Sequence, residues 1–180
     1  YQAYNIKGNI KNDMKDFLGA IEDINKALTF DSLYSEAYAN RGYAKNNIND
    51  FVGAIGDLNK ALKIDSNLSV AYNNRGIAYI NLKDYNSAYK NFNKAISINP
   101  YYIEAINNRG NLRAYIGDLK GSVEDLSVVI KLDSTNAMAF ANRGNSRLSL
   151  KDVKGACNDW NKALKLGFTQ VLSIMKTYCK

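Results

Sequence analysis

The chain has 180 residues, a formal net charge of +7, no histidine, two cysteines and one proline. It contains no run of about 18 apolar residues, so no membrane insertion is expected. Without histidine the commonest general base and metal ligand is missing, and we expect no enzyme, no metal, no cofactor and no small-molecule substrate.

The sequence repeats itself every 34 residues. An Asn-Arg-Gly triplet returns at this period, starting at Asn40, Asn74, Asn108 and Asn142. Units of this length cannot bury their own apolar face and must stack on their neighbours. The sequence therefore predicts five stacked units over residues 1–34, 35–68, 69–102, 103–136 and 137–170, followed by a tail over 171–180.

Each repeat is predicted to form two helices. The recurring positions 3, 4, 7, 8, 10, 11 and 14 follow helical spacing, as do positions 20, 21, 24, 27 and 28. An aspartate at position 16 suits the N-cap of the second helix, and the next boundary falls near position 32. Glycine at position 8 of every repeat indicates a close approach of the two helices. The expected N-caps are Asp16, Asp50, Asp84, Asp118 and Asp152.

The tail is predicted to form a helix that caps the last repeat. Gly167 is placed to end the preceding helix, and an apolar stripe follows it. We expect this helix to run from about 168 to 178 and to cover the open end of the array, because repeat arrays need such caps for solubility. The stripe consists of Phe168, Val171, Leu172, Met175 and Tyr178.

The repeat pattern resembles a known family. It has an aromatic residue at position 4, glycine at 8, an apolar residue at 17, alanine at 20 and 27, and proline at 32; residues 69–102 carry it most fully, in Tyr72, Gly76, Tyr79, Tyr85, Ala88, Phe92, Ala95 and Pro100. Over essentially its whole length the chain is similar to the tetratricopeptide repeat family. The resemblance implies an all-α, right-handed superhelical solenoid with a capping helix, serving as a non-catalytic scaffold for a protein or an extended peptide.

The resemblance also implies which residues meet that peptide. In the family the first helices of the repeats line a concave groove, and position 6 faces it; here that position carries Asn40, Asn74, Asn108 and Asn142. Primary amides both donate and accept, so such a ladder can hold a peptide backbone. The alternative is that these asparagines only link neighbouring helices. The other expected contacts are Tyr43, Val70, Asn73, Ile77, Ile80, Asn107, Asn111 and Tyr115, with an apolar centre in the third repeat.

A basic stripe follows positions 7 and 11, which share one helix face. Arginine recurs at position 7, as in Arg41 and Arg143, and aspartate recurs at position 23, as in Asp57 and Asp159. We predict that these side chains pair between the two helices of a repeat, because a partly buried guanidinium needs a partner. The competing interpretation is a surface for acidic polymers or nucleic acid, although nucleic acid is not the expected partner because no aromatic stacking platform accompanies the charge.

The ends and the cysteines leave several questions open. Cys157 is interpreted as a small core residue, and no disulfide framework is expected from two cysteines. Ile6 and Ile10 are left uncovered in the first repeat, so either further repeats precede it or this end self-associates with a second copy. The chain starts in mid-register at Tyr1, as a processed or excised piece would. A regulatory or targeting module of a larger protein is thus an alternative function, and no compartment is assigned beyond a preference for the cytoplasm.

Overall fold

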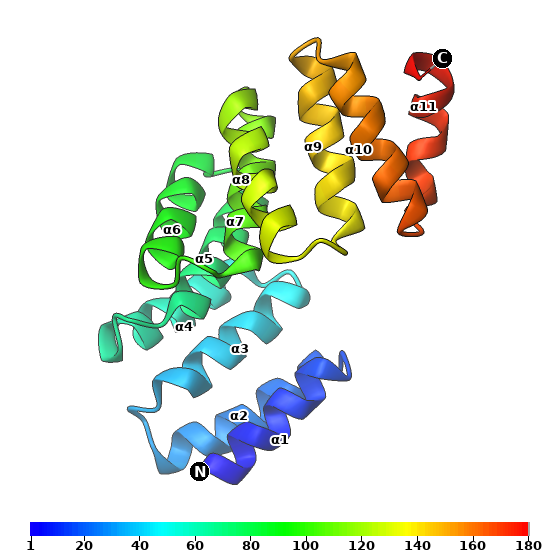
Figure 1. Ribbon diagram of the computed structural model, residues 1–180. Helices are drawn as coiled ribbons and strands as arrows, with labels where there is room; N and C mark the ends of the chain where they lie inside the picture. The colour runs from blue at the N-terminus through cyan, green and yellow to red at the C-terminus, as the bar shows by residue number, and fades with distance from the viewer. Residues whose placement is uncertain (180) are drawn as a thin grey trace. The chain divides into compact units, whose positions relative to one another are not determined.

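The computed structural model describes residues 1–179, which form helices and no strand (Figure 1). Two helices fall in each 34-residue repeat, at the predicted places, which confirms the all-α solenoid of helix-turn-helix repeats. The α-helices are α1 Gln2–Asp13, α2 Phe17–Phe30, α3 Ser35–Asn47, α4 Phe51–Ile64, α5 Ser69–Asn81, α6 Tyr85–Ile98, α7 Ile103–Tyr115, α8 Leu119–Leu132, α9 Ala137–Ser149, α10 Val153–Lys165 and α11 Leu172–Tyr178.

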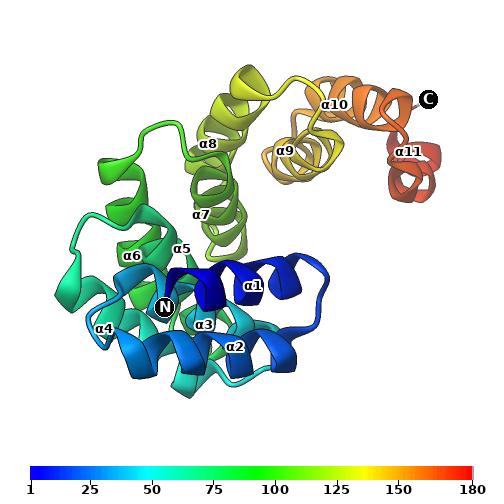
Figure 2. The ribbon, with the colours of Figure 1, turned by 90° about the horizontal axis from the view of Figure 1, so that it is seen from below.

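The chain consists of two compact units. The N-terminal unit comprises residues 1–100 with α1 to α6, and the C-terminal unit comprises the described residues from 101 onward with α7 to α11. Within each unit the two helices of a repeat pack on each other and on the next repeat. In both Figure 1 and Figure 2, α10 lies between α9 and α11. No helix within residues 1–179 is long and apolar enough to cross a membrane.

The predicted aspartate N-caps are confirmed in all five repeats. Asp50, for example, accepts a hydrogen bond from the backbone N–H of Gly53 over 2.9 Å. Each of these caps satisfies one of the amides that a helix start leaves without a partner. The same bond is made by Asp16, Asp84, Asp118 and Asp152, each to the amide three residues later.

The glycine at position 8 lets the paired helices approach closely, as predicted. A Cβ atom on Gly144 would lie 2.5 Å from the indole Nε1 of Trp160, which is much too short for a real contact. Trp160 itself is fully buried against α9. Because Gly144 has no side chain, the Trp160 indole of α10 can pack directly against the backbone of α9. The cores of the repeats are otherwise built on alanines with no exposed surface at positions 20 and 27, among them Ala54, Ala61 and Ala156.

The C-terminal cap forms, and the predicted stripe is confirmed in part, because Phe168, Val171 and Met175 pack against the last repeat. Residues Thr169–Val171 form a 3-10 helix, and α11 begins only at Leu172. Because a 3-10 turn has about three residues instead of 3.6, the helical face rotates. Ile174 packs into the core of the last repeat, whereas Leu172 and Tyr178 are 43% and 46% exposed. Lys180 lies outside the described residues.

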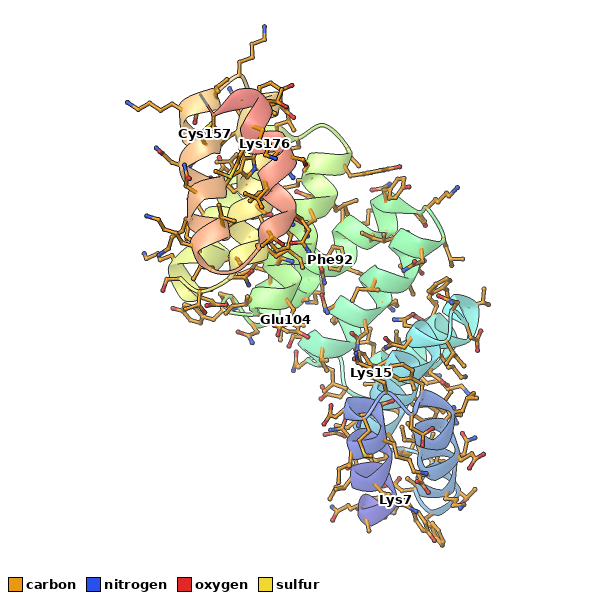
Figure 3. All side chains as sticks on the ribbon, turned by 90° about the vertical axis from the view of Figure 1, so that its right-hand side faces the viewer. Lys7, Lys15, Phe92, Glu104, Cys157 and Lys176 are labelled. Atoms are coloured by element: carbon orange, nitrogen blue, oxygen red, sulfur yellow. A yellow bond between two sulfur atoms is a disulfide. The ribbon has the colours of Figure 1, made fainter. Side chains whose placement is uncertain are left out.

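The expectation that the two cysteines form no disulfide is wrong, although Cys157 does pack against the core of the last repeat as expected. Cys157 of α10 and Cys179 behind α11 form a disulfide, with the two Cα atoms 5.6 Å apart. Figure 3 shows Cys157 on α10 with α11 alongside. Sequence spacing alone gave no sign of this bond, because 22 residues separate the two cysteines and only the cap brings them together. The bond ties the cap covalently to the last repeat.

At the opposite end, α1 presents an uncovered apolar face. Ile6 and Ile10 are 58% and 53% exposed. In the second and third repeats the residues equivalent to Ile10, Ala44 and Ala78, are fully buried by the preceding repeat. The two isoleucines are therefore accessible at this end of the N-terminal unit, as expected, and self-association there stays a prediction.

Candidate functional site

The basic stripe is paired with carboxylates. Arg41 donates from Nε and Nη2 to the two carboxylate oxygens of Asp57, over 2.8 Å and 2.6 Å. Lys45 Nζ lies 2.8 Å from the same carboxylate, and Asp57 is only 3% exposed. The predicted pairing of positions 7 and 23 is thus confirmed. Two cations also surround one aspartate at Lys7, Lys11 and Asp23, at Arg109, Arg113 and Asp125, and at Arg143, Arg147 and Asp159.

These arginines also reach a third helix. Arg41 Nη1 donates to Asn25 Oδ1 on α2 over 2.6 Å, in addition to its bonds with Asp57 on α4. Arg143 does the same toward Ser127 Oγ on α8, over 2.9 Å. Each arginine therefore connects the second helices of two successive repeats. Groups engaged in this way hold the solenoid together and are not available as a free surface for acidic polymers.

The third repeat replaces this cluster by one with a single arginine and no carboxylate. Arg75 donates to Asn91 Oδ1 over 2.8 Å and to Asn59 Oδ1 over 2.6 Å, and Tyr79 stands where other repeats have a lysine or arginine. Two cations with one carboxylate carry a net charge of +1, and so does one arginine with an asparagine and a tyrosine. Burial lowers the pKa of Arg75, since it lacks the carboxylate that the other clusters provide.

The carboxylate clusters make the fold sensitive to acid. Burial opposes the ionisation of Asp57, but the hydrogen bonds from Arg41 and Lys45 outweigh it and hold the pKa of Asp57 below its ordinary value. A pKa that is lower in the folded state contributes stability above the ordinary aspartate pKa of about 3.9, and this contribution is lost as the pH falls through the folded value. We therefore expect the free energy of unfolding to drop below about pH 4 in urea titrations. Asp57→Asn should show a smaller acid-dependent drop, and an identical drop would contradict this origin.

In the N-terminal unit, the asparagines mostly join neighbouring first helices. Asn40 Nδ2 donates to Asn5 Oδ1 over 3.1 Å, and Asn12 Nδ2 donates to the backbone carbonyl of Asn40 over 3.2 Å. Asn46 makes the equivalent bond to the carbonyl of Asn74 over 2.8 Å. The linking role considered for position 6 is thus seen at Asn40. Asn73 and Asn74 are buried, at 4% and 5% exposure, which leaves little of either amide at the surface.

The apolar residues expected at the centre of the face are more open. Tyr43 on α3 and Val70 on α5 are 40% and 42% exposed, while Ile77 and Ile80 on α5 are half-buried. The ring of Tyr43 meets that of Phe17 edge to face, with centroids 6.3 Å apart. The apolar part of this face therefore combines an anchored aromatic ring with aliphatic side chains from the adjacent helix.

The C-terminal unit contains a hollow on the same face of the repeats. It has a volume of about 390 Å³ and lies between α7 and α9. Three of the expected contact residues line it, namely Asn111, Asn142 and Tyr115. Asn142 Nδ2 donates to Asn111 Oδ1 over 2.9 Å, and Tyr115 is 71% exposed at the edge. The other lining residues are Ala114, Leu119, Asn145, Ser146 and Ser149.

The single tryptophan fixes the orientation of one amide in this hollow. Trp160 Nε1 donates to Asn145 Oδ1 over 3.1 Å. Because an indole nitrogen can only donate, the oxygen of Asn145 must face it and the Asn145 NH₂ group points away. Asn111 is oriented similarly by its bond from Asn142. Within residues 1–179 neither the Asn111 nor the Asn145 nitrogen has a hydrogen-bond partner.

Sequence reasoning missed part of this arrangement. Asn107 and Asn108 are half-buried on α7 and do not line the hollow, whereas Ser149 and Leu119 do. Asparagine recurs at position 9, and this pattern in the sequence marks both Asn111 and Asn145 for the groove. The hydrogen bond from Trp160 to Asn145 could not be read from the sequence, because it depends on how α10 packs against α9 at Gly144.

Comparisons with known proteins agree with this architecture. Residues 1–32 and 69–102 each match a family model described as tetratricopeptide repeat. No curated protein matches the chain.

Three solved structures illustrate the likeness in fold. A structure of MamA shares 24% identity with a TM-score of 0.78 and covers 88% of this chain and 93% of its own. YrrB, described as a TPR protein with an unusual peptide-binding site, shares 21% identity with a TM-score of 0.75, over 97% of this chain and 90% of its own. A thermophilic TPR protein from Thermus thermophilus, TTC0263, shares 16% identity with a TM-score of 0.77, over 99% and 96%. Residues 1–32 and 69–102 are therefore tetratricopeptide repeats, and the chain shares the fold of solved tetratricopeptide-repeat proteins over nearly its whole length.

Proposed function

We propose that this protein is a non-catalytic scaffold that binds an extended peptide segment of a partner protein along the first helices of its repeats. The observation that carries the proposal is the hollow between α7 and α9, lined by Asn111, Asn142 and Asn145. The nitrogens of Asn111 and Asn145 present N–H donors with no partner among the described residues. Peptide backbone carbonyls are acceptors that such donors can hold whatever the peptide side chains.

The composition of the hollow favours a peptide over an acidic polymer. No charged side chain lines it, and Tyr115 and Leu119 supply apolar surface beside the amides. A site with a few oriented polar groups on a partly apolar wall is typical of ligand recognition in proteins. The electrostatic alternative has lost its main support, because the arginines of the basic stripe are engaged with aspartates or asparagines.

The proposal can be tested by selecting peptides on the full chain from a phage-displayed library of random sequences. The variant to compare is Asn111→Asp combined with Asn145→Asp. An aspartate still accepts the bonds from Asn142 and Trp160, but it removes the free N–H donors. We expect the selected peptides to bind this variant at least about tenfold more weakly, which corresponds to about 1.4 kcal/mol.

A matched control carries the same change of charge elsewhere. Asn158→Asp with Asn161→Asp alters two exposed residues of α10 that do not line the hollow, and it should change affinity less than about twofold. Trp160 offers an independent readout, because it is the only tryptophan and is bonded to Asn145. Selected peptides should shift its emission. Equal loss of binding in both variants, with no change in Trp160 emission, would refute a site in this hollow.

A further inference from the structure

A second hollow lies in the N-terminal unit, and no asparagine is among its lining residues. It has a volume of about 470 Å³ and is formed where the turn between α2 and α3 meets the end of α4. Its lining residues are Ser32, Leu33, Tyr38, Lys60, Lys63 and Ile64. None of them belongs to the expected peptide-binding residues of the solenoid.

The walls of this hollow are apolar and open to solvent. Leu33 is 72% exposed and Ile64 is 38% exposed, and the half-buried Tyr38 lines the hollow together with them. At the position of Leu33 the last turn of the same type carries Thr135, whose hydroxyl donates to Asp133 over 2.7 Å. The side chain of Leu33 cannot make this hydrogen bond and presents only apolar surface.

The rim of the hollow is positively charged. Lys60 Nζ lies 5.5 Å from the centroid of the Tyr38 ring, and Arg41 Cζ lies 5.4 Å from it. Neither Lys60 nor Lys63 forms an ion pair within residues 1–179. No carboxylate lines the hollow.

Asp31 and Asp65, which lie close in sequence to Leu33 and Lys63, accept hydrogen bonds within their own turns. Asp31 accepts from the backbone N–H of Leu33 over 3.0 Å, and Asp65 accepts from that of Asn67 over 2.8 Å. Neither aspartate forms an ion pair with Lys60 or Lys63 within residues 1–179. The hollow combines an apolar floor with two unpaired ammonium groups, and this combination complements a ligand that has an apolar side chain flanked by negative charge.

We propose that this hollow is a second binding site, which takes an acidic peptide segment by inserting one aromatic or aliphatic side chain between Leu33, Tyr38 and Ile64. Lys60 and Lys63 pair with the carboxylates on either side of that side chain. The site is independent of the one proposed between α7 and α9, because it lies in the other unit and uses charge where the first uses amides.

The test uses the full ¹⁵N-labelled chain and the peptide acetyl-EEFEE-amide as the probe, followed by two-dimensional NMR. We expect saturable shifts of the backbone amides of residues 32–38 and 60–64. Acetyl-KKFKK-amide should cause no such shifts, and acetyl-EEGEE-amide should bind more weakly because it lacks the inserted ring. Raising the salt from about 50 mM to about 500 mM should weaken binding, since both lysines are solvent-exposed.

Variants separate the site from general attraction to a basic protein. Lys60→Gln with Lys63→Gln should weaken binding of acetyl-EEFEE-amide about fivefold, and Leu33→Thr about threefold. Lys162→Gln with Lys165→Gln is the matched control: these lysines occupy the same repeat positions as Lys60 and Lys63, and the turn of the preceding repeat carries Thr135 at the position of Leu33. It should change the affinity less than about twofold.

Three results would overturn the proposal. One is an equal loss of affinity in both lysine pairs, and another is a set of shifts centred on Asn111 and Asn145, which would assign the acidic peptide to the first hollow. The third is binding to phosphatidylglycerol vesicles that depends on Lys60 and Lys63 while the peptide causes no shifts. Failure of the site between α7 and α9 would leave the shifts at residues 32–38 and 60–64 unchanged, so the two proposals fail separately.

Discussion

Asp57→Asn is expected to lower the free energy of unfolding by about 3 kcal/mol, the low end of the range for breaking a buried ion pair. Asp57 is 3% exposed and is the shared partner of Arg41 and Lys45. Without its charge, two cations remain within a few ångströms of each other on one helix face, with neither water nor a carboxylate to compensate them fully. Urea denaturation followed by far-ultraviolet circular dichroism measures the loss. Glu22→Gln, which removes an exposed carboxylate, should cost less than about 0.5 kcal/mol.

The third repeat shows how this loss can be reversed. There the position of Asp57 is taken by Asn91 and that of Lys45 by Tyr79, so the net charge of the cluster is unchanged. The double variant Asp57→Asn with Lys45→Tyr should therefore recover a large part of the stability, with a coupling energy of about 1 to 2 kcal/mol between the two changes. Strict additivity of the two single changes would show that charge balance does not govern the cluster.

Cys179→Ser should lower the stability of the C-terminal unit by about 3 kcal/mol. The disulfide joins residues 22 positions apart, and a loop of that length restricts the unfolded chain by about this amount. The loss should be large because α11 has no fully buried residue of its own and depends on Ile174, Met175 and Cys179 for its packing. Denaturation followed by Trp160 emission reports this region, since Trp160 belongs to the same apolar cluster.

Reduction provides the control for this prediction. Treatment of the unmodified chain with a phosphine reductant should lower its midpoint to that of Cys179→Ser, whereas the variant should not respond to the reductant. The loss of unfolding free energy caused by Asp57→Asn, which lies in the N-terminal unit, should be the same with and without the reductant. A reduced chain with an unchanged midpoint would mean that apolar packing alone holds the cap.

The features that the sequence predicted well are those that recur at short range. The aspartate caps follow from one residue and the amide three positions later. The pairing of Arg41 with Asp57 follows from a spacing of 16 residues that returns in other repeats. Repetition itself supplied the evidence, because each copy offers an independent instance of the same contact.

The candidate sites were only partly predictable. Asn111, Asn142 and Tyr115 were expected on one face and line one hollow, but the orientation of Asn145 depends on an indole that packs against Gly144. Asn74 was expected to face a ligand and is instead 5% exposed. A periodicity argument assigns a residue to a face, whereas burial depends on how far the neighbouring helix covers it.

Taken by itself, the sequence determined the 34-residue period, the helix pairs, their caps and the tetratricopeptide-repeat character of the chain, because these depend on local spacing and on apolar patterns that each repeat restates. Three features were decided only by the tertiary structure. Cys157 forms a disulfide with Cys179, Trp160 orients Asn145, and Leu33 lines a hollow together with Lys60 and Lys63. Each of these contacts joins residues from different helices or turns at single places in the chain. Their geometry is set by packing between elements, which a repeated one-dimensional pattern does not encode.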